Sequence, residues 1–105
     1  MQIPVNNNRC SMLYVIYCKD NPSTPTRRDE FYDAHRAYLK SATIKILIAG
    51  PYTSVDSDKK IGSMLVVEAE TLEQALQFQR NDPFALNGVW SEVSVNPYLK
   101  SIDQR

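Results

Sequence analysis

The chain has 105 residues, a hydrophobic fraction of 43%, and 12 basic side chains that balance 12 acidic ones. This length suits one domain, and the zero net charge gives no field that would attract nucleic acids or anionic membranes. Because no apolar run approaches the roughly 20 residues of a membrane span and the N-terminus has no signal-peptide core, the sequence predicts a cytoplasmic protein without a nucleic-acid or membrane partner.

The first predicted elements are a strand and a helix. Residues 1–11 are polar and are expected to form a flexible N-terminal extension. The segment Met12–Cys18 is rich in β-branched and aromatic residues, which favour a strand. After a loop with two prolines, Thr26 is placed to cap a helix that runs from about Arg27 to about Ser41. Four residues recur along it at helical spacing and form one face: Phe31, His35, Tyr38 and Leu39.

The middle of the chain predicts a hairpin followed by a second helix. Lys45–Ala49 is a strand that we expect to stop at Gly50–Pro51, and Ile61–Glu68 is the strand that pairs with it. The segment Thr71–Gln74 has the S/T-x-x-E/Q form of a capping box and therefore predicts the start of the second helix. Pro83 is expected to end that helix because proline cannot continue it.

The end of the chain completes an α+β pattern. Phe84–Leu86 suggests a short helical turn, Val89–Val95 a fourth strand, and residues 100–105 a C-terminal tail after a domain at 12–99. The order β-α-β-β-α-β is that of the ferredoxin-like fold, with helices on one face of an antiparallel sheet. In this arrangement we expect the first and third strands to be parallel, so that the two helices run in the same direction.

Both faces of the predicted sheet are apolar. In the first strand, apolar residues alternate on the two sides: Leu13, Val15 and Tyr17 on one, Tyr14, Ile16 and Cys18 on the other. A sheet with helices on one face is normally polar on its second face, and the chain has no long loop to cover it. The pattern therefore predicts a homodimer that packs sheet to sheet.

His35 is the single histidine of the chain, and histidine exchanges protons readily near neutral pH. It is either a partly buried helix residue with one hydrogen bond or a proton carrier in a cleft. Asp82 is expected at the C-terminal end of the second helix, where the dipole disfavours a carboxylate. It is either a turn residue before Pro83 or the partner of a cation or hydrogen-bond donor. If the two residues meet, the carboxylate orients the imidazole as a minimal general base.

Three further residues are candidates for substrate contact. Arg28 lies seven residues before His35 on the same predicted helix face, and it either binds an anion or pairs with a nearby acid. Ser63 either lies under a cleft on the helix-facing side or is a neutral sheet serine. Gly50 either lets a ligand approach the backbone closely or simply ends a strand.

No cofactor is expected. One histidine without a nearby set of carboxylates or thiolates is a poor basis for a zinc or iron site. The two cysteines, Cys10 and Cys18, are too few for a disulfide framework or a four-ligand zinc site. A chain with three glycines has no glycine-rich phosphate loop.

Several short motifs, taken in order, resemble the YciI-like (YCII-related) family. They cover the chain from Met12 to about Leu99: Met12–Tyr17, Ala34–Leu39, Ala49–Pro51, Gly62–Ser63, Asn81–Phe84 and Val93–Tyr98.

The resemblance implies a dimeric α+β barrel, akin to muconolactone isomerase-like proteins, with His35 and Asp82 as the proposed active-site pair. It also implies that Gly50, Pro51 and Ser63 line the cleft. One branch of the family is associated with dehydrochlorination of a chlorinated hydroxyquinol. The expected function is thus that of a small cofactor-independent lyase or isomerase that acts on a small cyclic or aromatic substrate. The alternative is a non-catalytic module that binds a small molecule or serves as an accessory.

Overall fold

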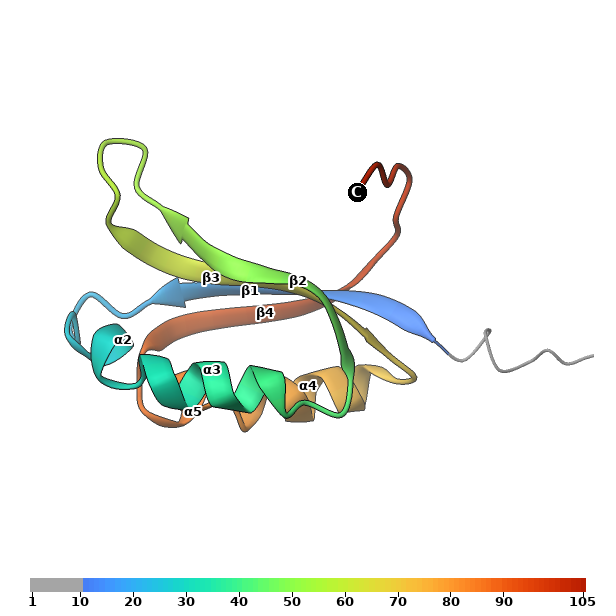
Figure 1. The fold of residues 1–105 in the computed structure, drawn as a ribbon, viewed down its shortest axis with the longest axis horizontal. Helices are drawn as coiled ribbons and strands as arrows, with labels where there is room; N and C mark the ends of the chain where they lie inside the picture. The colour runs from blue at the N-terminus through green and yellow to red at the C-terminus, as the bar shows by residue number, and fades with distance from the viewer. Residues whose placement is uncertain (1–10) are drawn as a thin grey trace, which may run out of the picture.

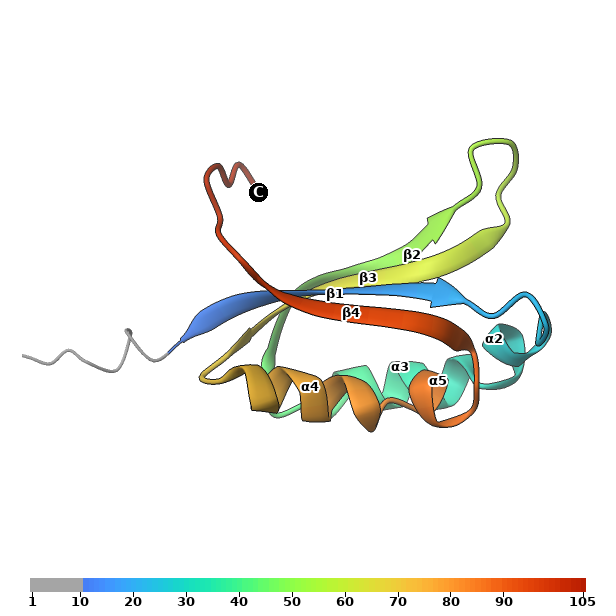
Figure 2. The same ribbon diagram turned by 180° about the vertical axis from the view of Figure 1, so that it is seen from behind.

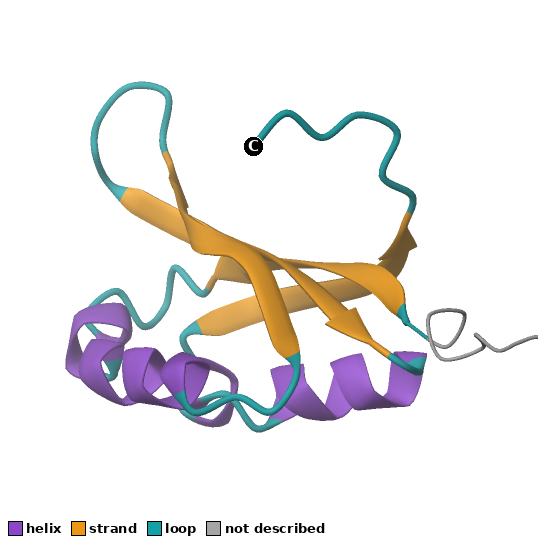
Figure 3. Ribbon diagram, turned by 45° about the vertical axis from the view of Figure 1, so that its right-hand side comes forward, coloured by secondary structure: helices purple, strands orange, loops and turns teal. Residues whose placement is uncertain are grey.

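A computed structural model describes residues 11–105, so most of the predicted N-terminal extension lies outside the described residues. Four strands form one antiparallel sheet in the order β2-β3-β1-β4: β1 (Met12–Asp20), β2 (Lys45–Thr53), β3 (Lys60–Ala69) and β4 (Trp90–Tyr98). The helices lie on one face of this sheet (Figures 1 and 3): α2 (Arg27–Glu30), α3 (Tyr32–Lys40), α4 (Leu72–Arg80) and α5 (Pro83–Leu86). This arrangement confirms the predicted ferredoxin-like α+β class. No helix in this part of the chain is long and apolar enough to span a membrane.

The strand β2 does not stop at Gly50–Pro51, so that prediction is wrong. It continues to Thr53, and Pro51 lies opposite Ser63 in the ladder with β3. Because β2 is at the edge of the sheet, a proline there need not remove a ladder hydrogen bond. The edge position also explains why the local stop signal of Gly-Pro did not end the strand.

Tyr52 packs tightly across the hairpin because residue 62 is glycine. A Cβ atom at Gly62 would collide with the Tyr52 ring and with the Cys18 carbonyl oxygen. The Tyr52 hydroxyl donates to that same carbonyl at 2.8 Å, and its ring stacks on Tyr17 with centroids 5.0 Å apart. Strands β1, β2 and β3 are thereby tied together near the end of β2.

The continuous helix predicted for 27–41 is interrupted. Phe31, with φ −108° and ψ 14°, separates α2 from α3, and the Thr26 side chain makes no capping hydrogen bond. Both arginines of α2 are held from outside the helix, Arg27 by the carbonyl oxygen of Asn87 and Arg28 by an acid on β1. These tertiary contacts hold α2 at an orientation different from that of α3. The apolar periodicity of the sequence does not predict this break.

The two main helices are antiparallel, and the prediction that they run in the same direction is wrong. β1 and β3 are adjacent antiparallel partners, so α3 and α4, which follow them, return in opposite directions (Figures 1 and 2). The first half of α3 consequently lies near the end of α4. This geometry, and not a parallel pair, brings the two predicted chemical residues to the same place.

The capping box at the start of α4 is confirmed. Thr71 Oγ1 accepts from the Gln74 backbone N–H at 3.1 Å, and Gln74 Oε1 accepts from the Glu70 N–H at 2.8 Å. The return bond reaches one residue earlier than in the usual capping box. Beyond the cap, Ala75 and Phe78 are buried against the helix-facing side of the sheet.

The second face of the sheet keeps large apolar side chains in contact with solvent. Tyr17, Ile48 and Met64 are 45%, 49% and 37% exposed. The C-terminal segment after β4 turns back on this side (Figure 1), where Arg105 Nη1 donates to the Leu47 carbonyl oxygen at 3.2 Å. A hollow of about 250 Å³ lies between the segment and the sheet. The chain thus carries a segment that reaches part of this face, contrary to the sequence-based expectation.

Candidate functional site

His35 and Asp82 meet at a buried point between α3 and α5. His35 Nδ1 lies 2.8 Å from Asp82 Oδ1, and the two residues are only 8% and 1% exposed. Asp82 does not close α4, as predicted, but is the N-cap of α5, where its Oδ1 also accepts from the Phe84 N–H at 2.9 Å. A carboxylate at a helix N-terminus is favoured, so the expected conflict with the helix dipole does not arise.

Aromatic rings fix the plane of the imidazole. The Phe84 ring stacks on His35 with centroids 3.9 Å apart and planes within 3°. The Trp90 ring stands at 86° to both of them, with centroids 6.2 Å from His35 and 5.6 Å from Phe84. Because an ionised carboxylate only accepts hydrogen bonds, Nδ1 carries the proton in the neutral ring. Nε2 is then the acceptor, and it makes no hydrogen bond with residues 11–105.

Arg28 is held by two side chains from the sheet. Its Nε and Nη2 donate to the two carboxylate oxygens of Asp20 at 2.8 and 2.7 Å, and Nη2 also donates to Ser63 Oγ at 2.9 Å. Arg28 Cζ lies 5.0 Å from the centroid of the Phe84 ring, which is the ring that stacks on His35. Of the two interpretations offered by the sequence, the structure places Arg28 with an acid partner.

Asp20 is the member of this cluster that sequence reasoning missed. It ends β1 and is separated from Arg28 by a loop with two prolines, so helical spacing gives no sign of the contact. The bidentate geometry is the strong form of an arginine–carboxylate pair. Asp20 is therefore the nearby acid that one of the two interpretations of Arg28 expected, and it neutralises this cation.

Gly50 and Pro51 lie apart from the His35–Asp82 contact. Both are exposed on the edge strand β2, and a Cβ atom at Gly50 would meet no atom within 4 Å. Gly50 is thus not a place where the backbone is crowded. Pro51 is linked to the cluster only through its ladder position opposite Ser63.

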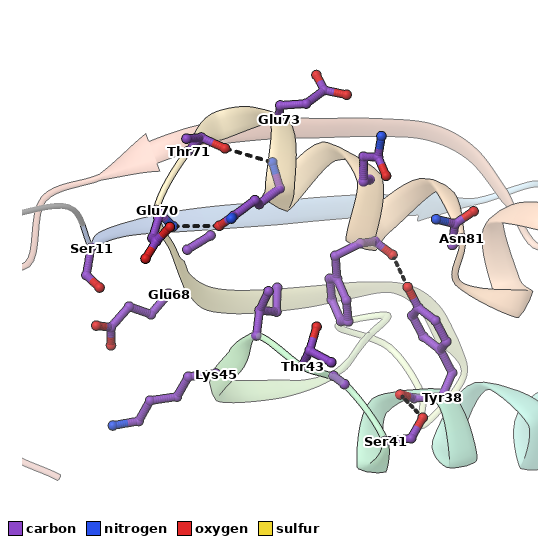
Figure 4. Close-up of a pocket in the computed structure, with 16 residues that line it drawn as sticks. Ser11, Tyr38, Ser41, Thr43, Lys45, Glu68, Glu70, Thr71, Glu73 and Asn81 are labelled. Atoms are coloured by element: carbon purple, nitrogen blue, oxygen red, sulfur yellow. Dashed lines mark hydrogen bonds between the residues drawn. The ribbon is translucent and has the colours of Figure 1, made fainter.

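The lining of a groove of about 860 Å³ includes Tyr38 and Asn81 (Figure 4), and Asn81 directly precedes Asp82 in the chain. Phe78 lines the same groove, and the Tyr38 hydroxyl donates to the Phe78 carbonyl oxygen at 2.8 Å. Burial and the charge of Asp82 raise the pKa of Tyr38. Neither His35 nor Asp82 lines this groove, or the two further hollows of about 580 and 250 Å³. Among residues 11–105, no group of three His, Cys, Asp or Glu side chains is placed to hold a metal ion.

The sequence matches a known protein family over most of its length. Residues 12–98 match the YCII-related domain. The chain belongs to the YCII-related family. Protein YciI of Escherichia coli O6:H1 is 36% identical over 96 residues, which cover 85% of this chain and 98% of that protein. An uncharacterized protein of Haemophilus influenzae is 32% identical with the same coverage.

Two solved structures place this YCII-related domain among known folds. The 5-chloro-2-hydroxyhydroquinone dehydrochlorinase TftG from Burkholderia phenoliruptrix AC1100, solved with 2,5-dihydroxybenzoquinone, is 34% identical with a TM-score of 0.77 and covers 84% of this chain and 94% of that one. SnoaB, a cofactor-independent oxygenase from Streptomyces nogalater, is 8% identical with a TM-score of 0.51. The match covers 89% of this chain and 95% of that one. The second likeness shows the fold alone. The family match and TftG confirm the family resemblance, and the two structures together confirm the ferredoxin-like α+β fold class.

Proposed function

We propose that this protein is a cofactor-independent lyase or isomerase in which His35 and Asp82 act as an acid–base pair on a small cyclic or aromatic substrate. The observation that carries the proposal is the 2.8 Å contact between His35 Nδ1 and buried Asp82, in a ring held flat against Phe84. Asp82 fixes the tautomer and stabilises the imidazolium, while Nε2 takes a proton from the substrate and later releases it.

The activity named for TftG supports this class of reaction. Loss of HCl from a chlorinated hydroquinone requires a base that removes a proton as the carbon–chlorine bond breaks, and it needs no external oxidant or reductant. A histidine with a bare Nε2 is suited to that step. The 34% identity and TM-score of 0.77 to TftG make its substrate type the first to be tried.

Arg28 and Ser63 are proposed to contact the substrate as hydrogen-bond donors. Among the described residues, Nη1 of Arg28 makes no hydrogen bond, so this edge of the guanidinium remains available. Because Asp20 balances its charge, we expect Arg28 to orient the substrate through directional hydrogen bonds more than to attract an anion by net charge. We propose Gly50 and Pro51 as the outer border of the same site, on the exposed edge of β2.

Chloride release from 5-chloro-2-hydroxyhydroquinone tests the proposal. His35→Ala and Asp82→Asn should each lower the rate by about 100-fold or more, the usual contribution of a general base. Asparagine caps a helix as well as aspartate does, so Asp82→Asn should retain the fold. Asp33→Asn, an exposed acid on the same helix as His35, is the matched control and should leave the rate unchanged. A wild-type rate in His35→Ala would overturn the proposal.

A non-catalytic binding module is the second candidate. His35 and Asp82 are buried and line none of the three described hollows. A ligand bound in one of those hollows therefore need not contact the pair, which favours binding without catalysis. In that case the wild type binds 2,5-dihydroxybenzoquinone without turnover of the chlorinated compound, and His35→Ala still binds. Loss of binding in His35→Ala together with measurable chloride release contradicts the module.

We further propose a homodimer formed through the open face of the sheet, in which Tyr17, Ile48 and Met64 are exposed. Contiguous apolar surface of this kind is typical of an interface. The cytoplasmic location expected from the sequence remains a prediction.

A further inference from the structure

The proposed chemistry places a demand on charge that Arg28 does not meet. A hydroxybenzoquinone is a vinylogous carboxylic acid, because its hydroxyl is conjugated through the ring to a carbonyl, and it is therefore an anion at neutral pH. Arg28 is already balanced by Asp20, whose carboxylate oxygens lie 2.7 and 2.8 Å from it. The chlorinated hydroquinone turns into an anion of this class as it loses HCl, and a second source of positive charge near His35 would favour binding of that anion.

Two cations contact one aromatic ring on α3, the helix that carries His35. Arg36 Cζ lies 5.8 Å and Lys60 Nζ 5.7 Å from the centroid of the Tyr32 ring. The ion pairs found among residues 11–105 include neither cation. Asp33 and Asp58 are close to them in sequence, yet neither is within the 4.0 Å of an ion pair with Arg36 or Lys60. Within residues 11–105, Arg36 and Lys60 therefore have no ion-pair partner.

Two members of this cluster lie a few residues from site residues on the same element, one on α3 and one on β3. Tyr32 precedes His35 by three residues of α3, which is a rise of about 5 Å along the helix. Lys60 precedes Ser63 by three residues of β3, which is about 10 Å of strand, and Ser63 is bonded to Arg28. The first turn of α3 and the start of β3 lie at the same end of the molecule (Figure 1).

We propose that Tyr32, Arg36 and Lys60 form an anion-recognition cluster at the entrance to His35, and that it selects planar organic anions of the hydroxyquinone or phenolate class. The inference rests on the proposed function at His35 and adds the charge of the quinone-type ring that the site binds. The Tyr32 ring holds the two cations on one surface, where they meet the ionised oxygens of an incoming ring and steer it toward Nε2.

Paired probes test the cluster. Binding of 2,5-dihydroxybenzoquinone, which is ionised, is compared with that of its neutral ether 2,5-dimethoxybenzoquinone by calorimetry, with the ring signals of the chain's single histidine followed by NMR. Lys60→Glu and Arg36→Glu should each weaken the ionised probe by about 5-fold or more and reduce its salt dependence. The neutral ether should not respond. Lys59→Glu carries the same charge change one residue away, without a contact to Tyr32, and should shift affinity less than about twofold.

The outcomes separate this inference from the proposed function. If the ionised probe shifts the His35 signals and all three variants bind it equally, the cluster is overturned while the site at His35 stands. An equal loss in Lys59→Glu and Lys60→Glu also overturns it, because net charge alone then accounts for the effect. If the wild type binds neither probe, the cluster is overturned and the chloride-release assay judges the catalytic proposal separately.

Discussion

At the scale of a single residue, one carboxylate oxygen of Asp82 makes hydrogen bonds with two partners. Its Oδ1 accepts from the Phe84 N–H, which starts α5, and it faces His35 Nδ1. The same atom therefore begins a helix and orients a candidate base. Substitutions at this position separate the two uses, because asparagine keeps the acceptor while alanine removes it.

Asp82→Ala should lower the free energy of unfolding by about 1–3 kcal/mol, since the helix loses its cap and a buried hydrogen bond is left without an acceptor. Asp82→Asn should cost less than half as much. Urea denaturation of the two variants and the wild type provides the measurement. Equal losses in both variants would show that the cap does not depend on Oδ1 of residue 82.

Cys18 gives a prediction for alkaline pH. Burial, and after it the charge of Asp82, raise the pKa of the Cys18 thiol from an ordinary 9.0 to about 12. Above pH 9 the unfolded chain releases this proton while the folded chain keeps it, so stability present below pH 9 is lost progressively up to about pH 12. The loss is about 1 kcal/mol for each pH unit in that range.

The Cys18→Ala variant isolates this effect. Between pH 8 and pH 10 the wild type should lose about 1 kcal/mol more unfolding free energy than the variant. Burial also raises the pKa values of Tyr38 and Tyr52, but both tyrosines are present in the two proteins and cancel in the comparison. Parallel losses in the two proteins would contradict a raised thiol pKa.

The sequence identified His35, Asp82 and Arg28 for chemical reasons, but it did not identify which acid pairs with Arg28. A lone histidine and a proline-linked aspartate are visible from residue type alone. The partner of Arg28 is not, because Asp20 ends a strand on the far side of a loop. Side-chain pairing across a loop depends on the tertiary path of the chain, and a single sequence does not specify it.

At the scale of elements, periodicity predicted which segments are helices and strands but not how they are joined. The break at Phe31 lies inside one continuous apolar pattern, and it arises because the arginines of α2 are held by the sheet and by the loop before β4. Likewise, β2 passes through Gly50–Pro51 because it is an edge strand. The direction of α4 follows from the antiparallel pairing of β1 with β3, which the predicted antiparallel sheet already implied and the expectation of parallel helices overlooked.

Gly88 is the glycine on which the loop between α5 and β4 depends. Its φ is +73°, and a Cβ atom there would lie 2.9 Å from Arg27 Nη1, the atom that donates to the Asn87 carbonyl oxygen. Gly88→Ala should therefore lower the unfolding free energy by about 1–2 kcal/mol. Gly50→Ala is the matched control, because no atom lies within 4 Å of its added Cβ, and it should change stability by less than about 0.5 kcal/mol. Thermal or urea unfolding of both variants distinguishes strain at residue 88 from a general cost of replacing glycine.

At the scale of the whole molecule, the two faces of the sheet differ in how they are covered. The helices bury one face, with Ile16 and Val67 almost fully enclosed. The C-terminal segment reaches only part of the other, through the hydrogen bond from Arg105 to the Leu47 carbonyl oxygen. Ile102 in that segment is itself 78% exposed. A single copy of the chain thus leaves apolar surface on both the sheet and the segment, which a second copy is suited to cover.

A lysine on this face should disrupt the proposed dimer. The wild type is expected at twice the 12.0 kDa mass of the chain in light scattering at micromolar concentration. Ile48→Lys places a charge in the centre of an apolar interface, where it is costly to desolvate, and should give the monomer mass with the fold retained, because this side chain is half exposed in one copy. Val55→Lys introduces the same charge at a fully exposed position in the β2–β3 turn and should leave the mass unchanged. A wild type of 12 kDa, or a dimer that survives Ile48→Lys, would show that the open face is not the interface, and the C-terminal segment would then be its main cover.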